Sequence, residues 1–322
     1  MKTKPIRDQR LGNNSLSLKL DLTPYFDVDG ITGSVVRLQT NAAGPGNVVF
    51  VELFDKLDPK QPGAKRTTPL TAANFLSYVD RGDYNGTIFH RLVKGFVLQG
   101  GGVALAKRTT PNGSMITDVR QGPTVLNEPG NGNIRGTLAM AKLGGDPNSA
   151  TNQFFVNLAD NRANLDKQNS GFTAFAQVLG KGMALFDRLA KSLIANAGGM
   201  FNELPLQNFT PAASGAKQPE LKQSNLLAIT QAERSDEVIY RVSAAGAKAV
   251  VAGDGQLQLS WNQAPTRPVT VTVEATSILD NTDKASLSFL VQPALADSGA
   301  DTSLKRLLLG PSAVGGVHSL VS

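Results

Sequence analysis

The sequence predicts a mainly β protein, in which a closed antiparallel β-barrel capped by two helices precedes a small C-terminal β-sandwich-like module. Strand-type alternation recurs along the chain, whereas only two segments have the helical period. Residues 202–225 are rich in Pro, Gln, Asn, Ser and Lys, which indicates an extended segment and a linker. A chain of 322 residues is long enough for two domains. The expected divisions are an N-terminal strand segment at 1–32, the barrel domain at 33–212, a linker at 213–232, the β-sandwich-like module at 233–292 and a tail at 293–322.

The first element is a strand at residues 16–22, where leucine alternates with polar residues. It lies upstream of the barrel, and its partner is open at this point. Packing against the barrel is one interpretation. The other is that it adds an edge strand to the C-terminal module, which would make the barrel an insertion within a discontinuous β-module.

The barrel region is expected to contain both helices. A proline-led helix at residues 70–79 has its apolar side chains on one face. The second carries Met183, Phe186, Leu189 and Leu193 and ends at Gly198. Strands are expected at 48–54, 137–141, 153–158 and 172–179.

The C-terminal module shows short strands at regular spacing. Residues 256–261 and 269–274 alternate strictly, so each strand buries one face, as in a sandwich. Strands are expected at 238–242, 249–252, 257–261, 269–275 and 287–291.

Residues 89–101 form the most informative stretch. Two alternating runs are separated by Gly95, which predicts two strands hinged at that glycine. Arg91 and Gln99 can then lie near one another among apolar neighbours. This pattern suits recognition of an uncharged polar group in an apolar groove rather than acid–base chemistry.

Composition excludes several functional classes. The absence of cysteine removes disulfides, thiolate nucleophiles and zinc–thiolate sites, and His90, of only two histidines, is expected to be structural. The net charge of +6 is scattered among acidic residues without aromatic interleaving, so no nucleic-acid partner is expected. No apolar run suits membrane insertion. The triplet at 100–102 lacks the Lys-Ser/Thr of a phosphate loop and is expected to be a turn. No metal or cofactor is expected.

Two blocks, residues 89–101 and 135–158, resemble the signatures of the cyclophilin family of peptidyl-prolyl cis-trans isomerases in its bacterial form. The resemblance covers roughly residues 35–210. The flanking strands look like an additional cadherin- or immunoglobulin-like β-module of bacterial surface proteins.

The resemblance implies an enzyme that accelerates rotation about Xaa-Pro bonds and assists folding. Its implied partners are proline-containing peptides and unfolded or folding proteins. Catalysis would fall to Arg91, Gln99 and Phe96, with the amide of Gln99 holding Arg91 in place. The implied substrate-binding residues are Val97, Met140, Ala141, Lys142, Gln153, Phe155, Leu165 and Phe172, of which Lys142 would act through its backbone and Met140 has packing as an equal alternative.

Some positions depart from the family pattern. Lys142 stands where asparagine is usual, and Phe172 replaces a histidine or tyrosine. Asn164 occupies the place of a tryptophan or phenylalanine, which puts cyclosporin binding in doubt.

A competing function is a non-catalytic module that binds proline peptides and is attached to a surface adhesion-type β-domain. The retained cation Arg91 favours the enzyme. The surface-type module favours a periplasmic or secreted location, with a signal outside this numbering. A cytoplasmic location is the alternative.

Overall fold

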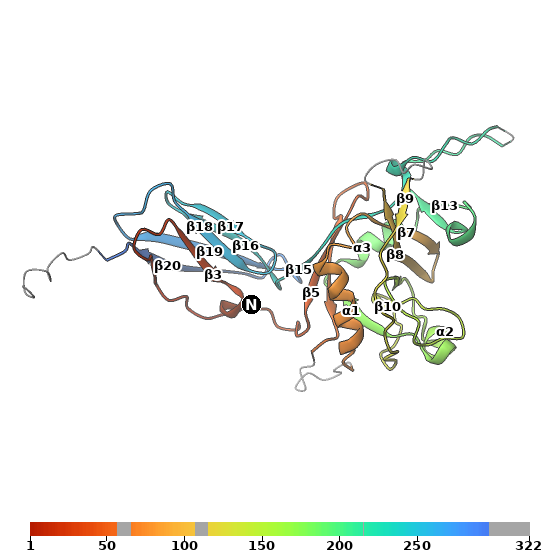
Figure 1. Ribbon diagram of the computed structural model, residues 1–322, viewed down its shortest axis with the longest axis horizontal. Helices are drawn as coiled ribbons and strands as arrows, with labels where there is room; N and C mark the ends of the chain where they lie inside the picture. Colours follow the sequence, from red (N-terminus) through yellow and green to blue (C-terminus); the bar gives the residue numbers. More distant parts are fainter. Residues whose placement is uncertain (57–65, 107–114, 215, 296–322) are drawn as a thin grey trace, which may run out of the picture.

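The computed structural model describes residues 1–56, 66–106, 115–214 and 216–295. Figure 1 shows two lobes: one contains the helices and the largest sheet, and the other contains β3 and β16 to β20. Within the described residues no helix is long and apolar enough to cross a membrane. The predicted tail, from residue 293 on, lies almost wholly outside the described residues.

The larger lobe is built on one antiparallel sheet, and its strand order is β15-β5-β6-β12-β10-β11-β8-β7, with β9 paired to β8. The strands are β5 (Val35–Thr40), β6 (Val48–Leu53), β7 (Thr87–Val93), β8 (Val97–Leu105), β9 (Ile116–Asp118), β10 (Thr137–Met140), β11 (Phe154–Asn157), β12 (Ala174–Val178) and β15 (Ile229–Ser235). The fully closed barrel that the sequence predicts is not formed. The end strands β7 and β15 share no ladder and are joined only around an isolated bridge between Ile88 and Ala228.

Three α-helices lie among the described residues: α1 (Pro69–Asp80), α2 (Arg162–Leu165) and α3 (Met183–Leu189). The first matches its prediction closely. The second predicted helix ends early, because Leu193 enters the short strand β13 (Leu193–Ala195), which pairs with β14 (Leu204–Leu206). The one-turn helix α2 is too short to produce a periodic signal, and the sequence did not predict it.

The core of this lobe lies between α1, α3 and the inner face of the sheet. Phe75 of α1 lies 5.0 to 5.4 Å, between ring centroids, from Tyr84, Phe154 and Phe175. Such aromatic packing fixes the helix on the sheet. The outer surface of β8, β10 and β11 is thereby left to form a separate apolar cluster, described below.

The second lobe has two small sheets with one shared core. One sheet has the order β16-β19-β20-β2 and the other β17-β18-β3. Its strands are β2 (Gln9–Arg10), β3 (Ser17–Asp21), β16 (Val238–Ala244), β17 (Lys248–Val251), β18 (Gln256–Ser260), β19 (Val269–Ser277) and β20 (Lys284–Gln292). The N-terminal strand β3 pairs with β18, and β2 pairs with β20. Of the two partners considered for this strand, the structure therefore has the C-terminal strands.

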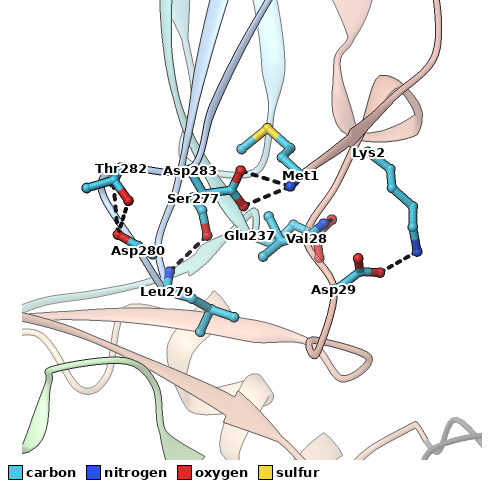
Figure 2. A network of polar contacts seen from close by, with 10 residues as sticks. All are labelled: Met1, Lys2, Val28, Asp29, Glu237, Ser277, Leu279, Asp280, Thr282 and Asp283. Atoms are coloured by element: carbon cyan, nitrogen blue, oxygen red, sulfur yellow. Dashed lines mark hydrogen bonds and ion pairs between the residues drawn. The ribbon is translucent and has the colours of Figure 1, made fainter.

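The chain crosses between the lobes twice, through residues 28–34 and through the pair Asp236 and Glu237. Figure 2 shows polar contacts that accompany this joint, such as the ion pair between the amine of Met1 and Asp283. The backbone N–H of Val28 donates to Oε1 of Glu237 at 2.8 Å, so the two connections are bonded to each other. Burial raises the pKa of the Glu237 carboxyl to about 7.

The glycine triplet at residues 100–102 lies inside β8 and is not the predicted turn. Gly101 has a φ of +87°, and a Cβ there would stand 2.6 Å from the carbonyl oxygen of Asn152. Glycine is needed because a neighbouring backbone approaches this strand closely.

The short strand β1 (Lys2–Thr3) pairs with β4 (Phe26–Asp27) beside the joint. Single turns of 3₁₀ helix lie at η1 (Thr23–Tyr25), η2 (Gln168–Ser170), η3 (Gly199–Phe201) and η4 (Gln223–Asn225). Of these, η2 and η3 border the site described next.

Candidate active site

An apolar pocket lies on the face of the sheet opposite the main core. Val97, Phe155 and Leu165 are buried there together with Ala139 and Ala174. The half-buried residues packed against this cluster are Phe96, Ala141, Phe172 and Val93. The sequence predicted six of these residues as site residues, and the structure brings all six together. The rings of Phe155 and Phe172 meet edge to face, with centroids 5.8 Å apart.

Arg91 supplies the cation near this pocket. It lies on β7 directly opposite Gln99 of β8, as the two-strand reading predicts. Its Nε donates to Oε2 of Glu203 at 2.8 Å, and the two side chains are 38% and 40% exposed. Within the described residues, the two terminal nitrogens of Arg91 make no hydrogen bond with protein. They are therefore available to a bound molecule.

Sequence reasoning missed Glu203. It follows η3 and enters β14, and its carbonyl oxygen accepts a hydrogen bond from the N–H of Leu92 at 2.7 Å. This bond brings the carboxylate beside Arg91 from 112 positions away in the chain. No local pattern marks the residue, because its role depends on the docking of β14 alongside β7.

Gln99 does not hold Arg91 in place, contrary to expectation. Its Nε2 donates to Oε1 of Gln153 at 2.9 Å. The carboxylate of Glu203 is a stronger acceptor for a guanidinium than a neutral amide is. Gln99 and Gln153 instead form an amide pair between β8 and the residue preceding β11.

Met140 is not in the pocket. It is buried in the main core, because side chains alternate along β10 and Ala139 takes the pocket-facing position. The alternative considered for this methionine, ordinary packing, is what the structure has.

Lys142 acts through its side chain, whereas a backbone role was expected. Its Nζ donates to the carbonyl oxygens of Asn169 and Gly171 at 2.8 and 2.7 Å. It also lies 4.8 Å from the ring centroid of Phe172. Burial lowers the pKa of this ammonium group.

Three buried asparagines connect the walls of the pocket from beneath. Nδ2 of Asn161 donates to the carbonyl oxygen of Phe96 at 2.9 Å and to Oδ1 of Asn157 at 2.7 Å. Asn157 in turn donates to Asn133, and Asn133 donates to the carbonyl oxygen of Phe172 at 3.0 Å. Because buried amides must keep their partners, this chain fixes Phe96 relative to Phe172.

The pocket offers no acid, base or nucleophile pair. His90 is buried, and burial lowers its pKa to about 4, so it is neutral near pH 7. Among the residues that the structure describes, no group of three or more His, Asp or Glu side chains could hold a metal ion. The geometry suits an apolar ring held beside a polar group that faces a guanidinium.

Comparisons with known proteins agree on one family. The model of the family "Cyclophilin type peptidyl-prolyl cis-trans isomerase/CLD" matches residues 64–210. A peptidyl-prolyl cis-trans isomerase of Acinetobacter baylyi is 36% identical over 180 residues, which are 55% of this chain and 82% of the relative. Peptidyl-prolyl cis-trans isomerase A of Dickeya dadantii is 37% identical over 186 residues, 56% of this chain and 83% of the relative. A solved cyclophilin-type isomerase of Cryptosporidium parvum aligns with a TM-score of 0.41 at 22% identity, covering 63% of this chain and 98% of its own.

Proposed function

We propose, from the premise that this chain belongs to the cyclophilin-type peptidyl-prolyl cis-trans isomerases, that it accelerates rotation about Xaa-Pro bonds and assists protein folding. One observation carries the assignment of the site. Arg91 stands beside an apolar pocket with its terminal nitrogens unoccupied, while its Nε is fixed by Glu203. The substrates are proline-containing peptides and folding chains.

The chemistry needs no bond to be made or cleaved. Rotation about the peptide bond meets a barrier of roughly 18 to 20 kcal/mol, because conjugation must be broken. In the twisted transition state the imide nitrogen becomes pyramidal, and its lone pair becomes a hydrogen-bond acceptor. A guanidinium directed at that nitrogen binds the transition state better than either ground state, which lowers the barrier. Arg91 fits because its charge is permanent and its donors form a rigid fork.

The pocket must contribute more than the cation does. An acceleration of about 10⁵-fold corresponds to about 7 kcal/mol. One charge-assisted hydrogen bond contributes about 1.5 to 3 kcal/mol. The remainder falls to a site that excludes water and clamps the peptide around the proline ring. Phe96, Phe155 and Phe172, held by the buried asparagines, are suited to that task.

Exchange spectroscopy on a short Ala-Pro peptide tests the proposal. Arg91→Ala should reduce catalysed exchange about 10- to 150-fold, the equivalent of the lost charge-assisted bond. Lys94→Ala removes an exposed cation from the same hairpin and should leave exchange unchanged. Exchange at the uncatalysed rate with the wild-type protein, together with measurable peptide binding, would support the non-catalytic binding module instead.

We propose further that the second lobe is a discontinuous β-sandwich of cadherin or immunoglobulin type, into which the isomerase domain is inserted between about residues 33 and 235. Support comes from the pairing of β3 with β18 and of β2 with β20, and from the core that the two sheets share. The segment expected as a linker, 213–232, overlaps β15 of the large sheet. Deletion of residues 1–22 should lower the melting temperature of the second lobe and leave isomerase activity intact. Unchanged melting of that lobe would refute the insertion.

A periplasmic or secreted location remains our proposal from the surface-type β-module. Fractionation of host cells with an antibody against this chain tests it. Recovery in the cytoplasm alone would exclude it.

A further inference from the structure

The loop that leads into Phe172 has an unfavourable backbone. Asn169 and Ser170 have φ values of +49° and +63°, so two successive residues with side chains lie in the left-handed region. Each costs free energy there, and such residues persist only where surrounding contacts hold them. Phe172 follows two positions later and packs against Phe155. The conformation of this loop therefore decides where one wall of the pocket stands.

Lys142 supplies several of the contacts that hold the loop. Its ammonium group, at the end of β10, bonds to the carbonyl oxygens of Asn169 and Gly171, on either side of Ser170. The same nitrogen lies over the ring of Phe172. An ammonium can direct separate protons at two carbonyls and a ring face, which the planar fork of arginine cannot do from one atom.

Asn127 contributes a second, weaker hold. Its Nδ2 donates to the carbonyl oxygens of Ser170 and Gly171 at 3.1 and 2.9 Å. The carbonyl of Gly171 thus receives both the neutral amide and the charged Nζ of Lys142. Hydrogen bonds from a charged donor are shorter and stronger than neutral ones, so the lysine dominates.

We propose that Lys142 is a positioning residue for the isomerase: its ammonium group holds residues 169–171 in the left-handed conformation and so sets the distance of Phe172 from Phe155. This inference rests on the proposed function and names a determinant of its affinity for the proline side of the peptide. Arg91 lies on a different strand and is not in contact with Lys142. Loss of the lysine should therefore weaken binding more than it slows the chemical step.

Three variants test this proposal. Lys142→Met keeps the length of the side chain and removes its donors. It should raise KM for an Ala-Pro peptide, and the Kd measured by titration, roughly tenfold, while kcat changes less than twofold. Lys167→Met changes an exposed lysine beside the same loop and should change neither constant.

The decisive variant is Lys142→Met combined with Ser170→Gly. Ser170 is exposed and its hydroxyl makes no hydrogen bond with the described residues, so glycine removes the left-handed strain without removing a contact. The double variant should recover KM and Kd to within about threefold of the wild type. Ring resonances of Phe172 should shift in the single variant and return in the double one.

Two results would overturn the proposal. Unchanged KM and Kd in Lys142→Met would show that the loop holds itself. Failure of Ser170→Gly to restore them would show that the lysine contacts the peptide directly. A wild-type protein that binds the peptide without accelerating exchange would refute the proposed function alone, because Kd and the Phe172 resonances still report on the loop.

Discussion

Glu203 should orient the guanidinium of Arg91, and its removal should slow catalysis. The bond between Nε of Arg91 and Oε2 of Glu203 is 2.8 Å long, and both side chains are more than a third exposed. Ion pairs with this exposure are typically coupled by about 0.2 to 1 kcal/mol, since solvent screens them. Glu203→Ala should therefore lower kcat/KM about two- to fivefold. The free energy of unfolding should change by no more than about 1 kcal/mol.

The assay is exchange spectroscopy on an Ala-Pro peptide, with urea unfolding of the same preparations. A matched control is Asp80→Asn, which breaks the ion pair of Asp80 with Arg234. That pair has similar exposure, at 48% and 46%, but it joins α1 to β15 away from the pocket. Unchanged kcat/KM in Glu203→Ala would refute the orienting role. A faster enzyme would mean that the carboxylate restrains the cation.

Three further predictions concern stability. The folded-state pKa of His90 lies below its ordinary value, so the stability from burying it neutral is complete above pH 6.5 and is lost as pH falls toward 4; His90→Phe should flatten urea-unfolding stability over that window. Glu237 has the opposite sign, because its folded pKa is raised from 4.5 to about 7. Its contribution is complete below pH 4.5 and disappears by pH 7, so Glu237→Gln should remove a loss of order 1 kcal/mol, discounted for partial exposure, in melts of the second lobe. Gly33→Ala would place a Cβ 1.8 Å from the carbonyl oxygen of Leu53 and should destabilise by about 1 to 3 kcal/mol, whereas Gly12→Ala, with 4.0 Å of space, should be neutral in the same melts.

Local pattern was sufficient where one strand or turn carries its own signal. The alternation at residues 89–101 with a break at Gly95 predicted β7, β8 and the cross-strand pairing of Arg91 with Gln99. Gly95 has a φ of +72°, a value that glycine adopts without strain. The C-terminal strands were predicted for the same reason, because each alternates strictly over its own length.

Partners distant in the chain were not predictable. The carboxylate of Glu203 reaches Arg91 only because β14 docks along β7, and no spacing in the sequence encodes that contact. The pairing of β3 with β18 stayed open because an alternating strand shows which face it buries but not against which strand.

The facing of single residues also escaped the sequence. A buried strand such as β10 is apolar on both sides, so its pattern does not tell Met140 from Ala139. The side-chain role of Lys142 depends on two carbonyls that a left-handed loop presents, and no motif announces that loop.

The central claim is that Arg91 faces the imide of a proline whose ring occupies the pocket. A crystal structure of this chain with a bound Ala-Pro peptide measures that arrangement directly. We expect the ring against Phe155 and Phe172, and a terminal nitrogen of Arg91 about 3 Å from the proline nitrogen. A peptide bound elsewhere, or a guanidinium that leaves the imide without a donor, would contradict the mechanism.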